Sequence, residues 1–99
     1  MDKIQLVSST ITMLADAARW SSGGSVSTML GILTQYTYTC NAMLYGKEVE
    51  IDDPYGIPIS YDRGVIKRVT LRLTYHPYFV VELPDGKLRE YVAKRLKLK

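Results

Sequence analysis

The residues of this 99-residue chain best suited to ligand chemistry are cations interleaved with tyrosines near its C-terminal end. Guanidinium and ammonium groups neutralise phosphates and release counterions, and tyrosine rings stack on bases. Arg68 and Arg72 are four residues apart, so in an extended strand they project from the same face. The predicted nucleic-acid-binding set consists of Arg68, Arg72, Tyr75, Tyr78, Lys87, Arg89, Lys94, Arg95 and Lys97, with Lys99 beside it.

The distribution of charge along the sequence supports this hypothesis better than the total charge does. The formal net charge is only +3. Residues 1–46 are neutral and residues 47–62 carry −4, whereas residues 63–99 carry ten Lys or Arg against three acids, a net of +7. Clustered cations raise a local potential that a small total charge conceals. The C-terminal third is therefore expected to offer a basic surface to a polyanion such as DNA or RNA. The alternative is that these side chains only solvate a sheet and protect its edge.

Enzyme chemistry lacks the residues that it needs. His76 is the only histidine and Cys40 the only cysteine, and Cys40 falls on an apolar helix face, where a thiol serves for packing. The glycines do not have the spacing of a phosphate loop, and Asp52 and Asp53 do not have that of a calcium loop. We therefore expect a protein that is not an enzyme, with no cofactor and no metal.

The sequence predicts a cytoplasmic protein that is not inserted in a membrane. A single cysteine cannot form an intrachain disulfide, and no secretory signal is recognisable. The segment from Trp20 to Gly46 contains no charged residue. However, ten Ser, Thr, Gln or Asn residues interrupt it, so it lacks the run of about 20 apolar residues that a membrane span requires.

Two helices are expected to come before the elements that hold the basic residues. Asp2 is placed to cap the first, although Ser8 or Ser9 would cap a shorter one. Ser25 is expected to cap the second, and Gly46 to end it. Helical spacing predicts one buried stripe in each helix. The first stripe is Ile4, Val7, Ile11, Leu14, Ala15 and Ala18, and the second is Val26, Met29, Leu30, Leu33, Tyr36, Cys40, Met43 and Leu44.

After Gly46 the apolar residues alternate, which predicts five strands. The first two cover residues 47–51 and 65–75, and His76-Pro77 ends the second because proline lacks a ladder donor. Residues 78–83 and 87–92 form a hairpin around Pro84-Asp85-Gly86, and residues 96–98 form a last strand after a turn at 93–95. A helix over 88–96 is the alternative. In the second strand, Val65, Val69, Leu71, Leu73 and Tyr75 are expected on the apolar face, opposite Ile66, Arg68, Thr70, Arg72 and Thr74.

The segment from Gly46 to Lys99 resembles the small SH3-like barrels of the KOW and Tudor type. The resemblance lies in the short strand Lys47–Ile51, a long loop, the strand opening Gly64-Val65-Ile66, and the Asp-Gly hairpin of residues 78–87. Residues 91–98 then follow the pattern of a helical turn and a final strand. The resemblance implies a five-stranded barrel of the kind that binds nucleic acid, proline-rich peptides or methylated side chains, so the fold does not choose among them.

The segment between the first two strands offers a second type of site. In peptide-binding SH3 domains, acids of the first long loop engage a basic residue, and its tyrosines line a polyproline groove. Asp52, Asp53, Tyr55, Tyr61 and Asp62 are similar in composition. Asp-rich segments also form turns through local hydrogen bonds, which is the favoured interpretation.

Together these patterns predict an α+β fold, with a helical hairpin over residues 1–45 and a five-stranded antiparallel SH3-like barrel over 46–99 in one compact unit. The expected function is low-selectivity binding of nucleic acid through phosphate contacts on a basic barrel face. The alternative is a protein-interaction adaptor that uses residues 52–62 and the apolar helical face. In that case a homodimer would form through residues 26–44.

Overall fold

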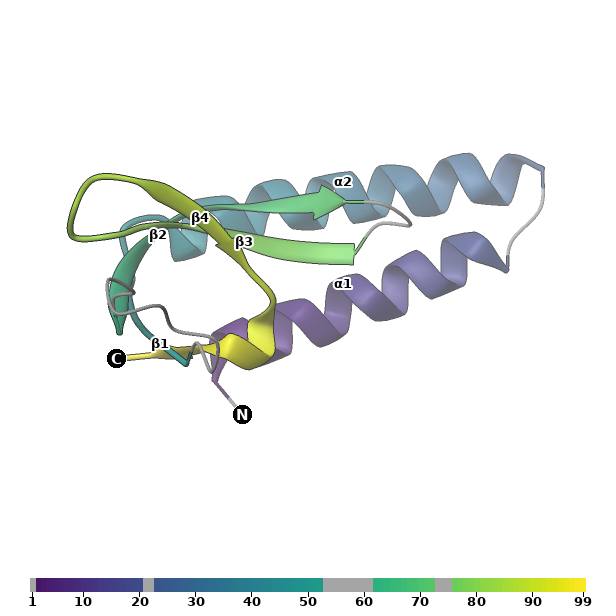
Figure 1. Cartoon of the computed structure of the whole chain (residues 1–99). Helices are drawn as coiled ribbons and strands as arrows, with labels where there is room; N and C mark the ends of the chain where they lie inside the picture. Colours follow the sequence, from purple (N-terminus) through teal and green to yellow (C-terminus); the bar gives the residue numbers. More distant parts are fainter. Residues whose placement is uncertain (1, 21–22, 53–61, 73–75) are drawn as a thin grey trace.

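The computed structural model describes residues 2–20, 23–52, 62–72 and 76–99 (Figure 1). Its elements are α1 (Lys3–Arg19), α2 (Gly24–Leu44), β1 (Glu48–Ile51), β2 (Arg63–Arg72), β3 (His76–Glu82), β4 (Leu88–Tyr91), the 3-10 turn η2 (Ala93–Arg95) and β5 (Leu96–Leu98). Figure 1 shows the two helices side by side, with their connected ends extending past the sheet. The molecule is accordingly elongated, 49 × 25 × 25 Å. A helical hairpin followed by five antiparallel strands confirms the predicted α+β class.

Helix α1 forms as its sequence pattern predicts. The Asp2 carboxylate accepts a hydrogen bond from the Gln5 backbone N–H at 3.0 Å, which satisfies one of the free donors of the first turn. The buried residues are Ile4, Val7, Ile11, Ala15 and Ala18, and Leu14 is partly buried against the core. The longer of the two helices considered from the sequence is therefore the one that forms.

Helix α2 begins two residues before the position that the sequence predicts. Gly23 is its N-cap, with φ of 59° and no side-chain capping bond, so the predicted cap at Ser25 is wrong. A positive φ is open to glycine because it has no Cβ, and this allows the chain to enter the helix early. At the other end Gly46 has φ of 80° and follows the last helical turn, as predicted.

The five strands form one open sheet in the order β4-β3-β2-β1-β5. Strands β4 and β5 are its two edges and do not pair with each other, so the sheet is not closed into the expected barrel. Both edge strands are short, with four and three residues, which leaves little backbone available for closure. The turn at Pro84-Asp85-Gly86, η2 and β5 form as predicted, and the alternative helix over 88–96 does not.

A β-bulge in β2 changes which residues face the core. Ile66 pairs with Val81 and Arg68 with Val80, so Lys67 is an extra residue with no directly opposite residue on β3. Ile66 is therefore fully buried on the core side together with Val69, and Val65 is only partly buried. The expected placement of Val65 on the apolar face and Ile66 on the other was wrong. An extra residue in one strand shifts the alternation of side chains between the two faces by one position.

The start of β3 also differs from prediction, whereas the predicted strand residues 73–75 lie outside the described residues. β3 begins at His76, which pairs with Arg72, and Pro77 pairs with Leu71. These two residues therefore open a strand instead of ending one. Pro77 has no β4 partner, because β4 first pairs at Phe79, so its missing donor interrupts no bond of that ladder.

The helices and strands share one hydrophobic core, and polar side chains also join them. Asp2 accepts a second hydrogen bond from the Leu98 backbone N–H at 3.1 Å. The Gln5 side chain donates to the Ala93 carbonyl at 2.6 Å. From α2, the Asn41 side-chain oxygen accepts a bond from the Val69 backbone N–H. These bonds attach α1 to η2 and β5, and the C-terminal part of α2 to β2.

Candidate functional site

The outer face of the sheet, defined as the face away from the helices, holds part of the predicted nucleic-acid site. The β2–β3 register places Arg68 opposite Val80, Arg72 opposite His76, and Tyr78 opposite Thr70. Alternation puts Arg68 and Arg72 on the same face, as predicted, with Tyr78 between them on the neighbouring strand. Tyr75, the other expected stacking residue, lies outside the described residues.

Carboxylates occupy the same face and pair with some of its cations. Arg72 forms an ion pair with Glu90 of β4. Lys67 lies 3.1 Å from a Glu82 oxygen, and its ammonium is 5.3 Å from the centre of the Tyr45 ring. The hydrogen bond and the charge of Glu82 raise the pKa of Lys67. Val80 is buried between Arg68 and Glu90, its cross-strand neighbours. Long charged side chains often cover an apolar neighbour in this way.

The other predicted cations do not join this face as one patch. Arg89 pairs with Val81, so it lies on the side of the sheet that faces the helices. Lys87 follows the hairpin turn at the β4 edge, and its N–H is bonded to Asp85. Lys94 and Arg95 belong to η2, and Lys97 of β5 pairs with Glu50. The structure therefore distributes the described members of the predicted set over four places: the outer face, the helix-facing side of β4, the hairpin turn, and η2 with β5.

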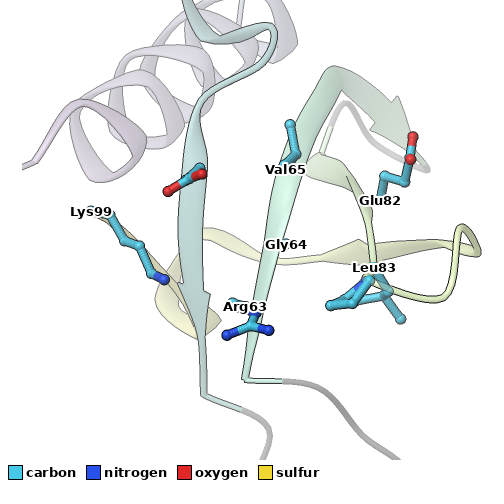
Figure 2. Close-up of a pocket in the computed structure, with 8 residues that line it drawn as sticks. Arg63, Gly64, Val65, Glu82, Leu83 and Lys99 are labelled. Carbon is cyan, nitrogen blue, oxygen red and sulfur yellow. The ribbon is translucent and has the colours of Figure 1, made fainter.

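A hollow of about 410 Å³ next to the outer face includes residues that the sequence did not single out. Glu48 and Glu82 line it together with Arg63 and Lys99, and Figure 2 shows the last three around β2 and its neighbours. Gly64 also lines it, and an added Cβ there would clash with the Val81 side chain. Charges of both signs line this hollow, so it favours no ligand charge. Its residues come together through strand register, which the sequence does not display.

The residues considered for enzyme or loop chemistry lie apart. His76 is exposed, and its ring meets the Tyr78 ring edge-on, with 6.4 Å between the ring centres. Cys40, in contrast, is fully buried. Desolvation raises the pKa of the Cys40 thiol. Asp52 and Asp62 are exposed beside β1 and β2, and Asp53, Tyr55 and Tyr61 lie outside the described residues. Within the described part of the chain, no three His, Cys, Asp or Glu side chains are grouped as metal ligands.

The helical hairpin exposes a line of large apolar side chains. Leu6, Met13 and Trp20 recur every seven residues, directly opposite the buried line of Ile4, Ile11 and Ala18. Their exposed fractions are 54%, 64% and 86%. This line faces away from the core, because α1 packs against the sheet through its other side.

Helix α2 continues the same surface. Tyr36, which is hydrogen-bonded to Thr10, marks where α2 meets α1. Ile32 and Met43 lie one and two turns from Tyr36 on nearly the same line and are 46% and 44% exposed. We call Leu6, Met13, Trp20, Ile32 and Met43 the outer apolar face. The prediction that Met43 belongs to the core was wrong. The signal in the sequence for this face is the seven-residue spacing of Leu6, Met13 and Trp20, which was not among the predicted sites.

Comparison with known proteins gives no match to a family model, a curated protein or a solved structure. Of the helices in the described ranges, none has the length and hydropathy to cross a bilayer.

Proposed function

We propose that this chain is a non-catalytic protein-interaction module that binds its partner through the outer apolar face. The observation that carries the proposal is the exposed line of Leu6, Met13 and Trp20 opposite the buried stripe of α1. Exposed apolar residues are common singly, but a contiguous patch of several hundred Å² is typical of an interaction site.

The apolar area that could be buried on the hairpin, compared with the mixed charge of the sheet, favours this proposal over nucleic-acid binding. At roughly 200 Å² for each fully exposed large side chain, the outer apolar face offers on the order of 600 Å². Burying that area at about 25 cal/mol per Å² is worth on the order of 15 kcal/mol before the costs of association. The cations of the sheet, in contrast, alternate with carboxylates, as on an ordinary protein surface.

A matched pair of variants tests the proposal. Met13→Glu places a charge in the middle of the outer apolar face, and Leu88→Glu makes the same change at a 56% exposed leucine on β4. We expect proteins captured from a lysate of the source cells by the wild-type chain to be retained by Leu88→Glu and lost by Met13→Glu. Equal capture by both variants would assign the interaction to another surface.

The second candidate remains nucleic-acid binding, and one observation favours it. Lys94, Arg95, Lys97 and Lys99 fall within six consecutive residues, in η2, in β5 and directly after it, and none of them makes an ion pair with a described carboxylate. Under either proposal, we also propose that the protein is cytoplasmic and that residues 46–99 are related to SH3-like modules.

A salt titration tests this candidate. Binding to single-stranded and duplex DNA should weaken steeply with salt, with the slope of log K against log salt falling by about 1 for each phosphate contact removed. We expect Lys94→Ala and Lys97→Ala to reduce that slope, and Arg72→Ala to change it less because Arg72 is paired with Glu90. No retention on DNA at low salt would exclude this function.

A further inference from the structure

We propose that the partner of the outer apolar face is a second copy of this chain, giving a symmetric dimer in which two helical hairpins pack antiparallel. This inference rests on the proposed function and names the partner. It extends the sequence-based hypothesis of pairing through residues 26–44, because the longest exposed line belongs to α1.

The spacing of the large residues on α1 is self-complementary. A two-fold axis through Met13 brings the two Met13 side chains together. It also places Leu6 of each copy beside the second copy's Trp20, because both residues are seven positions from Met13. The smaller residues Thr10 and Ala17 lie between these contacts and allow the helices to approach. Every large side chain of the line then has an apolar neighbour.

The charge of the face also fits an identical partner. Helix α2 contains no charged residue, and the α1 line from Leu6 to Trp20 has none at the positions that form it. Asp16 and Arg19, on the flank of α1, are paired with each other at 3.3 Å. Two copies can therefore meet without repulsion, although the chain as a whole is basic.

The area and the shape meet the requirements of a dimer. A stable interface of standard size buries about 800 Å² on each partner, and roughly 600 Å² comes from the five large side chains alone. Polar and small residues between them, such as Thr10, Ala17 and Thr39, supply the remainder. The sheet lies on the opposite side of the hairpin, so the two sheets of a dimer remain outside and do not collide.

The oligomeric state of the full chain tests the proposal. Sedimentation equilibrium of the wild type should give a mass that rises from 11.2 kDa towards twice that value as concentration increases. Trp20 is the only tryptophan and is highly exposed in one copy, so its fluorescence should shift to the blue over the same concentrations.

Three variants localise the interface. Met13→Glu should be a monomer throughout, and Trp20→Ala should weaken the dimer at least tenfold. Tyr38→Glu is the control on α2, because Tyr38 is exposed on a different line of the helix from Ile32 and Met43, and it should dimerise like the wild type. Far-UV circular dichroism confirms that each variant keeps its helices.

Other results separate the second-copy inference from the proposed function. A wild-type monomer up to roughly 1 mM overturns the second-copy inference. If such a monomer still captures a protein that Met13→Glu loses, the proposed function stands. If Trp20 shifts only with vesicles of neutral phospholipid and no protein is captured, both are overturned. A dimer that persists in Met13→Glu places the interface elsewhere.

Discussion

Cys40 shows how one buried side chain links stability to pH. It lies in the core where α2 meets α1, with the Tyr36 hydroxyl as its hydrogen-bond partner. Burial raises the pKa of its thiol, and the bond from Tyr36 offsets this only in part. The folded protein therefore holds the thiol proton more tightly than the unfolded chain does.

This raised pKa predicts a loss of stability in mild alkali. The contribution of Cys40 is complete below pH about 8.5, the unfolded pKa of a thiol, and is lost as pH rises from there towards the folded pKa. In urea unfolding with a reductant present, the wild type should lose more free energy of unfolding between pH 8 and pH 9.5 than Cys40→Ala does. Equal losses in the two proteins would show that Cys40 does not supply the pH dependence.

At the scale of elements, a side-chain amide of α2 forms a hydrogen bond to the backbone of β2. The Val69 backbone N–H donates a hydrogen bond to the Asn41 side-chain oxygen, just beyond the bulge, and this bond links the two elements. It satisfies a backbone donor of a central strand that is partly buried, and an unsatisfied donor there is costly.

Removing this amide should destabilise the fold without affecting the outer apolar face. We expect Asn41→Ala to lower the free energy of unfolding by about 1–3 kcal/mol, because the Val69 N–H loses its acceptor. Gln35→Ala, at an exposed amide on the same helix, should change it by less than about 0.5 kcal/mol. Chemical denaturation measures both, and similar values for the two variants would contradict the role of Asn41.

Elements of local origin were predictable, and those that depend on distant partners were not. The stripe from Ile4 to Ala18 defines α1, because helical period is a local property. The bulge at Lys67 depends on how β2 pairs with β3, and it reverses the faces of Val65 and Ile66. Met13 and Trp20 lie opposite the predicted buried stripe of α1, so their exposure could have been inferred from the sequence, whereas the exposure of Met43 on α2 depends on how the two helices pack.

In the whole molecule, the acidic and basic segments that are separate in the sequence lie next to each other in the folded structure. The acidic stretch 47–62 and the basic stretch 63–99 meet on the sheet, where Glu50 of β1 pairs with Arg63 of β2 and with Lys97 of β5. Most of the predicted cations are exposed, and this interleaving of charges along the strands sets where they lie. The outer apolar face, together with the uncharged helix α2, is the part of the surface that differs most from an ordinary one.

The bond between the Asp2 carboxylate and the Leu98 N–H joins positions 96 residues apart. A growing chain can form α1 early, but the first turn of that helix lacks this partner until the last strand has left the ribosome. This contact therefore cannot form until β5 has been synthesised, and such distant contacts slow folding. Until then the buried stripes of α1 and α2 lack the complete sheet that covers them, so this is the interval in which the nascent chain is most prone to aggregate.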